Sequence, residues 1–396
     1  MVIATGTRNP DHDPAPSLRR LHTGLQAGGY TPDTLQRLLG ITRPDDVGPL
    51  NHAPACERIR SDRGSAATLV RLFFLEEPET AARIASALTP TLCAELVTFG
   101  LLRKRNGQLT AQLRIDAVED QYFLADRRFQ RIAVSALRLS GGDPVYPPSS
   151  DSLLLREAVN APTARRVLDL CTGSGVQALR HLPTAEHITA VDLNPRATAM
   201  ARLNAAFNGA DRVDVRRGDL YAPVRGERFD LIIANPPFVA SPYSNGPAYH
   251  AGGGRGDRVL RRIIAGWEGH LAPRGRAFAI THCALRAGEP IEGVARSWFS
   301  RFSGRALVLV LEEGTAVDLA AAQSLFALDR GLAAYAREVR RWVTHLRRLH
   351  FQTVALLLII AERAVPRCME VVDAQPRVLH LPLTPSTADR IATWLG

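Results

Sequence analysis

The stretch "VLDLCTGSGVQAL", residues 167–179, combines an apolar strand, a glycine-rich turn and the start of a helix. Asp169 lies in the strand, and Gly173 and Gly175 lie in the turn. Glycine lets a backbone approach a ligand closely, where a Cβ would clash, and amides at a helix N-terminus then face that ligand. One turn of this kind is a weak signal, because many strand-to-helix turns share the pattern.

Three further strands end in polar residues. The strand in "HITAVDLNP", residues 187–195, ends at Asp192, whose carboxylate can accept both hydroxyls of a ribose. The next strand is followed by "GDL", residues 218–220, where Asp219 can accept an exocyclic amine of adenine and Leu220 can lie against the ring. The fourth strand, in "FDLIIANPPF", ends in Asn235, two prolines and Phe238. Each end alone could be a cap, a turn or a strand stop, but the four in this order predict a cofactor site.

Apolar strands alternate with helical segments from about residue 165 onwards, which predicts an α/β fold with a doubly wound, Rossmann-like parallel sheet of seven strands. The run "TVALLLIIA", residues 353–361, is predicted to be a buried strand, and residues 317–350 two helices before it. In such sheets ligands bind at the carboxyl ends of the strands. The four polar strand ends therefore meet at one edge.

The N-terminal part is predicted to be a smaller, mainly helical domain. Three helical segments precede "LLRKRNGQLTAQLRI", where Asn106-Gly107 indicates a β-hairpin. This order resembles a winged helix, which would dock on nucleic acid or protein, or would only shape a substrate cleft. The segment "TPTLCAELVTFG", residues 89–100, contains no arginine, which favours the second reading because phosphate and base contacts use such side chains. The expected boundaries are a disordered segment 1–16, the N-terminal domain 17–120, the Rossmann-like domain 121–365 and an extension 366–396.

The composition is that of a globular protein with a basic surface. The net charge is +10, yet one lysine stands against 48 arginines and these are scattered, which favours a solvated surface over a phosphate-binding one. The five cysteines form no CxxC pair, so reduced thiols and no metal site are expected. No signal-peptide pattern and no apolar run of about 20 residues is present, so we expect a cytoplasmic protein without membrane contact.

Residues 150–285 resemble the class I S-adenosylmethionine-dependent methyltransferases of the HemK-like group, which carry an NPPY motif. "DLCTGSG", residues 169–175, is similar to the first motif of that group, and Asn235 to Phe238 are similar to NPPY with phenylalanine in place of tyrosine. The resemblance implies S-adenosyl-L-methionine as cofactor. It also implies that "YPPSSDSLLL", residues 146–155, folds over the methionine end, with Asp151 and Ser152 as further contacts. The implied cofactor-binding residues are Asp169, Thr172, Gly173, Ser174, Gly175, Asp192, Leu193, Asp219, Leu220 and Asn235.

The motif after the fourth strand suits transfer to a planar nitrogen. The side-chain oxygen of Asn235 and the carbonyl oxygen of Pro236 can accept both N–H groups of an NH2, which stabilises positive charge developing on the nitrogen. Phe238 can stack on the flat group. Asn235, Pro236 and Phe238 are therefore the catalytic candidates; the candidates for substrate contacts are Pro237 and, in the glycine-rich segment 249–257, Tyr249, His250 and Asp257.

Three functions follow from these patterns. The first is a methyltransferase that acts on a planar amide or amine nitrogen, in a protein glutamine or a nucleobase. The second keeps this chemistry with a small-molecule acceptor, derived from an amino acid, a peptide or another natural product. The third is a nucleic-acid-binding winged-helix protein with a vestigial cofactor fold, against which the intact Asn-Pro-Pro-Phe motif argues.

Overall fold

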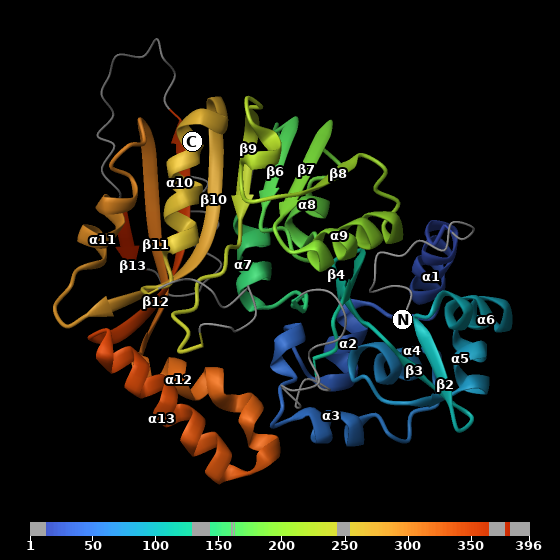
Figure 1. The fold of residues 1–396 in the computed structure, drawn as a ribbon. Coiled ribbons are helices and arrows are strands. Elements are labelled where there is room, and N and C mark those ends of the chain that lie inside the picture. The colour runs from blue at the N-terminus through green and yellow to red at the C-terminus, as the bar shows by residue number, and fades with distance from the viewer. Residues whose placement is uncertain are drawn as a thin grey trace. The chain divides into compact units, whose positions relative to one another are not determined.

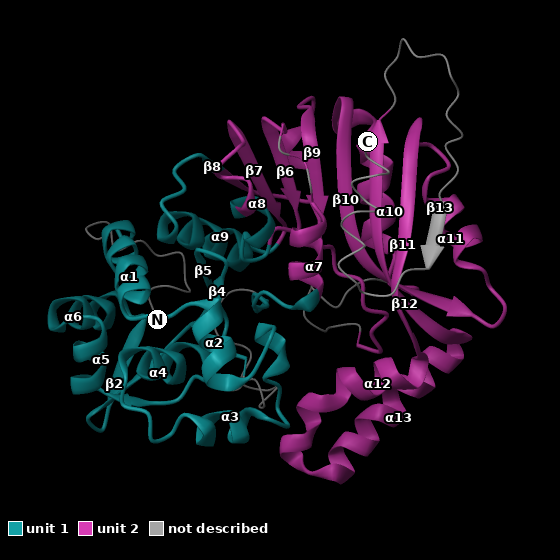
Figure 2. Cartoon of the chain, turned by 180° about the vertical axis from the view of Figure 1, so that it is seen from behind, with its two compact units in different colours: residues 1–150, 173–179, 194–213 teal, residues 151–172, 180–193, 214–396 magenta. Residues whose placement is uncertain are grey.

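The computed structural model describes residues 13–128, 143–159, 161, 163–243 and 254–363, and the backbone of 377–380. Two compact units result (Figure 2): unit 1 holds residues 1–150, 173–179 and 194–213, and unit 2 holds the remaining segments. Most of the segment expected to be disordered lies outside the described residues, and helix α1 begins within it, at Ala15. Most of the extension 366–396 lies outside them too.

Unit 2 is built on one sheet (Figure 1), in the order β13-β11-β12-β10-β9-β6-β7-β8. The seven strands expected from the sequence are all present, and β13 is an eighth. Their bounds are β6 Arg166–Leu170, β7 His187–Asp192, β8 Val213–Arg217, β9 Phe229–Ala234, β10 Leu271–Arg286, β11 Gly304–Thr315, β12 Phe351–Arg363 and β13 Arg377–His380.

The direction of the strands differs in part from the expectation of a parallel sheet. Strands β6, β7, β9 and β10 are parallel along their shared edges, whereas β12 runs antiparallel to both β10 and β11. The sequence of β12 does not reveal its direction. A strand that is covered on both faces is continuously apolar whether it runs parallel or antiparallel to its neighbours. Chain order reverses between β6 and β9, and this switch point is where ligands bind in open α/β sheets.

The helices of unit 2 bury one apolar side each. Helix α10, Arg258–His270, packs Leu260, Ile263, Ile264 and Trp267 into the core cluster that includes β9 and β10, and its arginines lie outside that row. Two helices precede β12 as expected. The helices of unit 2 besides α10 are α7 Ser150–Ala158, α11 Ile291–Trp298, α12 Ala316–Ser324, η6 Leu325–Arg330 and α13 Leu332–Arg348, and the short η4 is Ala222–Val224.

Unit 1 has helices followed by a hairpin, as the sequence indicates. Asn106 and Gly107 both have positive φ, 51° and 77°, and connect β2, Leu102–Arg105, to β3, Gln108–Ala111, in a two-residue turn. The winged-helix interpretation stays a prediction. The other elements are α1 Ala15–Ala27, α2 Pro32–Leu39, η1 Pro44–Asp46, α3 His52–Arg58, α4 Ser65–Leu69, η2 Val70–Phe74, β1 Glu79–Thr80, α5 Ala81–Ala87, α6 Pro90–Phe99, β4 Arg114–Val118 and β5 Gln121–Ala125.

Unit 1 also contains two segments that the sequence places in the Rossmann-like domain. These are the first residues of α8, Val176–Arg180, and helix α9, Pro195–Phe207. Met200 and Phe207 of α9 are buried in the same core cluster as Leu18 and Tyr122. The compact units therefore do not follow the boundary expected near residue 120, because tertiary packing assigns α9 to the N-terminal residues.

No helix in the described ranges is long and apolar enough to span a bilayer.

Candidate active site

Three aspartates gather at the carboxyl ends of the parallel strands in unit 2. Burial and the negative charges of Asp192, Asp169 and Asp219 raise the pKa of the Cys171 thiol well above its ordinary value, so all three carboxylates lie near enough to act on this side chain. The backbone N–H of Gly218 donates to the carbonyl of Asp192 at 2.9 Å. The predicted strand-end aspartates are thus brought together at one edge of the sheet.

Asp169 is a buried carboxylate that shapes the loop after β6. It is 1% exposed, and its Oδ2 accepts the Thr172 hydroxyl at 2.5 Å. The N–H of Thr172 in turn donates to the carbonyl of Val191 at 3.1 Å, which ties the loop to β7. Both side chains act on the path of the loop, and their role toward a cofactor stays a prediction.

The glycine loop belongs to unit 1. Gly173 and Gly175 have φ of 55° and 85°, a left-handed backbone that side chains disfavour. A Cβ on Gly175 would meet Ala201 at an ordinary 3.6 Å, so the conformation rather than space requires glycine there. Ser174 is buried, and its carbonyl oxygen accepts a hydrogen bond from the Asn204 side chain at 2.7 Å. The loop is therefore held in a defined shape by α9.

The cofactor candidates Leu193, Asp219 and Leu220 differ in exposure. Leu193, directly after Asp192, is 62% exposed, an unusual place for a large apolar side chain and one where it can contact a ligand. Asp219 is half-exposed, and its Oδ2 accepts Arg262 of α10 at 2.7 Å. Leu220 is buried with φ of 49°, so its left-handed backbone turns the chain just after Asp219.

Asn235 is held in one orientation by α7. Its Nδ2 donates to Asp151 Oδ2 at 2.9 Å and to Ser152 Oγ at 3.2 Å. An ionised carboxylate can only accept, so the nitrogen end of the amide must face Asp151. The carbonyl oxygen of the amide, Oδ1, consequently points away from Asp151 and Ser152. It is the atom of the Asn235 side chain that can accept a hydrogen bond. Asp151 and Ser152, expected as weaker cofactor contacts, both bind Asn235, and their contact with a cofactor stays a prediction.

The residues after Asn235 are partly enclosed. Pro236 is buried, and Pro237 and Phe238 are half-buried. Phe238 packs with the cluster of Val239, Ala320 and Trp342, and its ring centroid lies 4.6 Å from that of His282. One side of the Phe238 ring is therefore occupied by protein.

His282 was missed by sequence reasoning. It lies on β10, three residues beyond Ala279, which pairs with Ala234 just before Asn235. Burial lowers its pKa, an effect that Asp151 opposes, and Nδ1 is buried without a hydrogen-bond partner among the described residues. A neutral imidazole thus stands beside Phe238. A histidine inside the apolar run "AFAITHCAL" was the available signal.

Of the three candidate substrate contacts in the glycine-rich segment 249–257, the structure describes one. Tyr249 and His250 lie outside the described residues. Asp257 is 6% exposed, and its Oδ2 accepts Arg261 at 2.7 Å and the Trp298 indole N–H at 2.9 Å. These bonds give Asp257 a structural role at the start of α10, and a substrate contact there stays a prediction.

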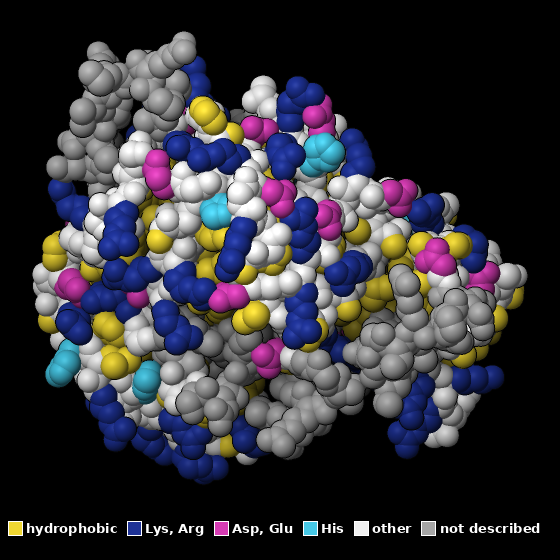
Figure 3. Space-filling view, turned by 45° about the horizontal axis from the view of Figure 1, so that its top comes forward, with side chains coloured by type: hydrophobic (Ala, Val, Ile, Leu, Met, Phe, Trp, Pro, Cys, Tyr) yellow, Lys and Arg dark blue, Asp and Glu magenta, His cyan; other side chains and the backbone are white. Residues whose placement is uncertain are grey.

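The basic side chains do not gather into one patch on the face seen in Figure 3, where acidic and apolar side chains lie between them. This distribution agrees with the scattered arginines of the sequence. It gives no groove of continuous positive charge on that face.

Comparison with known proteins identifies two regions. Residues 149–297 match the methyltransferase small domain, and residues 27–112 match a domain of unknown function, DUF7059. The ribosomal protein uL3 glutamine methyltransferase of Bradyrhizobium diazoefficiens is 42% identical over 131 residues, 30% of this chain and 41% of that protein. The release factor glutamine methyltransferase of Xylella fastidiosa strain Temecula1 is 32% identical over 183 residues, 42% of this chain and 65% of that protein.

The chain spans about half the length of these curated relatives, 41% and 65%. Among solved structures, the YcgJ protein of Bacillus subtilis has a TM-score of 0.35 at 18% identity, over 54% of this chain and 98% of that one. The family match confirms the methyltransferase resemblance predicted for residues 150–285.

Proposed function

With residues 149–297 forming a methyltransferase small domain, we propose that this chain transfers a methyl group from S-adenosyl-L-methionine to the amide nitrogen of a glutamine side chain in a protein. The observation that carries the proposal is the anchoring of Asn235 through Nδ2 by Asp151 and Ser152. That anchoring leaves Oδ1 as an oriented acceptor at a strand end, where a ligand binds.

The residues present fit the cofactor. A left-handed glycine loop offers backbone N–H groups without a Cβ, which suits the charged methionine end. The carboxylates of Asp192 and Asp219 suit the ribose hydroxyls and the adenine amine, and the exposed Leu193 offers an apolar contact for the base. When bound, the cofactor supplies an electrophilic methyl group on a sulfonium.

The chain's own residues prepare the acceptor. An amide nitrogen is a poor nucleophile because its lone pair is delocalised into the carbonyl group. Asn235 Oδ1 and the Pro236 carbonyl accept its N–H groups, which orients the nitrogen and stabilises the positive charge that develops on it. Proline at 236 has no N–H to compete and restricts the backbone, so the carbonyl keeps its direction. Holding the nitrogen in place is the remaining contribution.

The acceptor is inferred from the relatives. The similar proteins of Bradyrhizobium and Xylella are named for glutamine methylation of ribosomal protein uL3 and of release factor. A glutamine side chain presents the planar NH2 that the pair of oxygens at 235 and 236 fits. The partner class is therefore a protein of the translation apparatus.

The test starts with cofactor binding, measured by calorimetry, followed by turnover on purified bacterial uL3 and release factor with tritiated cofactor. Mass spectrometry then locates the methyl group. We expect binding and a methylated glutamine in one of the two proteins. Absence of cofactor binding would refute the methyltransferase, whereas binding with methylation of a nucleic acid or metabolite only would refute the protein acceptor.

Two variants separate catalysis from binding. Asn235→Ala should lower turnover about 10²–10³-fold, the usual cost of one oriented charge-stabilising group, with cofactor affinity nearly unchanged. Ser152→Ala keeps the Asp151 bond and should lower turnover less. Equal turnover in Asn235→Ala and in the unaltered protein would contradict the role of the amide.

A further inference from the structure

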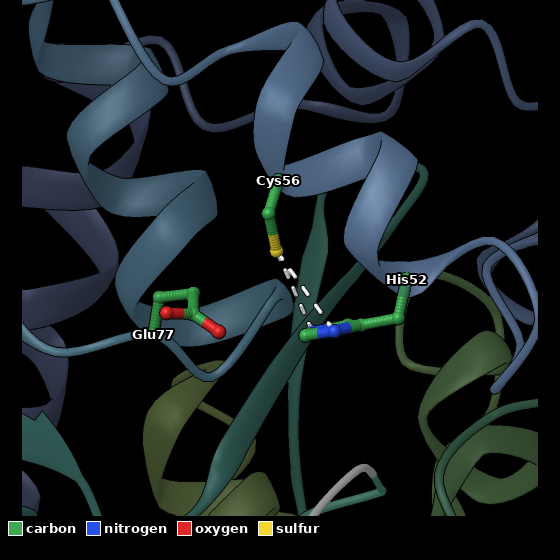
Figure 4. Close-up of side chains that lie close together, drawn as sticks. All are labelled: His52, Cys56 and Glu77. Carbon is green, nitrogen blue, oxygen red and sulfur yellow. Dashed lines mark hydrogen bonds between the residues drawn. The ribbon is translucent and has the colours of Figure 1, made fainter.

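Three potential metal ligands meet in unit 1, and none of them belongs to the candidate active site. His52 and Cys56 lie on α3, and Glu77 follows η2 (Figure 4). One ligand atom of each lies within 4.8 Å of the others, and all three side chains are half-buried. Positions four apart on a helix share a face, so α3 presents its imidazole and thiol together toward the carboxylate.

The orientation of His52 suits a ligand. Its Nε2 lies 2.8 Å from the carbonyl oxygen of Leu75. A carbonyl oxygen can only accept, so this nitrogen carries the proton and Nδ1 keeps its lone pair. Metal-binding histidines usually donate their second N–H to such a carbonyl, which sets the tautomer and the direction of the ring. The bond to Leu75 therefore prepares Nδ1 as a ligand.

The spacing of the ligand atoms is close to that of a zinc site. The Cys56 sulfur lies 3.9 Å from Nδ1 and 3.7 Å from Nε2 of His52. Bond lengths of about 2.3 Å to sulfur and 2.0 Å to nitrogen at a tetrahedral angle place these atoms about 3.5 Å apart. Nδ1 and Sγ lie about 0.4 Å farther apart than this, so a bound ion would draw them together.

Glu77 forms no ion pair among the described residues. Four arginines line the same pocket, and none forms an ion pair with Glu77 within the described part of the chain. Arg71 and Arg83 bind Glu79, and Arg60 binds Glu57. The Glu77 carboxylate, half-buried beside the thiol and the imidazole, can therefore serve as a third ligand.

We propose that His52, Cys56 and Glu77 bind one zinc ion through Nδ1, Sγ and a carboxylate oxygen. Thiolate and imidazole ligands favour zinc over magnesium or calcium, which prefer oxygen ligands only. The fourth position faces a cavity of about 530 Å³ lined by these residues and by arginines, so water or an anionic ligand completes the tetrahedron. The ion joins α3 to the turn after η2. This site is independent of the proposed methyl transfer.

The test uses the full-length chain without an affinity tag, purified from zinc-supplemented medium. Mass spectrometry of the elements should find about one zinc per chain. Replacing zinc by cobalt should give the intense near-ultraviolet band of a thiolate–cobalt bond, and a chelator should lower the melting temperature by several degrees. A zinc content near zero together with no cobalt band would overturn the proposal.

Matched variants make the result specific. Cys56→Ser and Glu77→Gln should reduce zinc affinity at least tenfold, and Cys56→Ser should abolish the cobalt band. Cys93→Ser is the control, because Cys93 is a buried thiol in the same core cluster and not one of the three ligands. A band that survives in Cys56→Ser, or that is lost equally in Cys93→Ser, would show that these three residues are not the site.

Discussion

Asn204 Nδ2 donates to the carbonyl oxygen of Ser174 at 2.7 Å, so a side chain of α9 holds the middle of the glycine loop. The same amide binds both backbone groups of Leu124 on β5, at 2.7 and 2.9 Å. Asn208, one helical turn later, binds both groups of Tyr122 at 2.9 and 2.8 Å. Four helical residues rise about 6 Å and two strand residues about 7 Å, so the two amides match alternate residues of β5.

The first prediction concerns this arrangement. Asn204→Ala removes the bonds to Leu124 and to Ser174, whereas Asn208→Ala removes the equivalent bonds to Tyr122 and one bond to the Asn204 carbonyl, with none to the glycine loop. Both should lower the free energy of unfolding by about 1–3 kcal/mol, because buried backbone groups lose partners. Asn204→Ala alone should also weaken cofactor binding, about fivefold for one lost hydrogen bond of about 1 kcal/mol. Calorimetric titration with S-adenosyl-L-methionine provides the measurement; equal affinities in the two variants would mean that Ser174 needs no such support.

The second prediction concerns pH and His282. Burial lowers the pKa of this imidazole, so it is neutral at pH 7 and becomes charged only below its ordinary 6.5. The imidazolium would stand beside Phe238 and oppose positive charge on the acceptor nitrogen. Turnover should therefore fall as pH drops below about 6.5, and this acid limb should shrink in His282→Gln. An unchanged pH–rate profile in that variant would exclude the residue from the reaction.

A third expectation links acid sensitivity to His181. Burial, with Arg156 and Arg180 nearby, lowers the pKa of His181 to about 4 in the folded chain. Between about pH 4 and pH 6.5 the unfolded chain binds a proton on His181 more readily than the folded chain does. The contribution of His181 to the free energy of unfolding is therefore complete above pH 6.5 and is lost as the pH falls to 4. The loss amounts to about 3 kcal/mol at most. Urea unfolding at pH 7 and pH 5 should show a smaller difference for His181→Gln than for the unaltered chain; identical differences would assign the effect to other groups.

The fourth prediction tests a buried ion pair in unit 1. Arg114 and Asp116 on β4 are both 0% exposed, with Arg114 Nη2 at 2.8 Å from Asp116, and Arg114 also donates to the carbonyl of Phe74 at 2.9 Å. Removing one partner leaves a buried charge, which costs about 3–5 kcal/mol. Asp116→Ala should therefore lower the melting temperature far more than Asp211→Ala, which breaks an exposed pair with Arg19. Similar shifts in the two variants would contradict this account.

Much of the fold could be predicted because its signals are local. A strand ending in Asp192 or Asn235, the two-residue turn at Asn106-Gly107 and the apolar run of β12 each follow from neighbouring residues. Backbone preference and burial act within a few positions, and the ends of parallel strands must share an edge. The candidate aspartates were found for this reason.

Other features depend on segments that are far apart along the chain. Asn235 receives its orientation from Asp151, α9 packs with the N-terminal helices, and β12 runs antiparallel to its neighbours. The packing of His282 against Phe238 and the approach of Glu77 to His52 and Cys56 follow from no spacing along the chain. Side-chain hydrogen bonds and packing act over a few ångströms in space, so only the folded chain shows which of these residues meet.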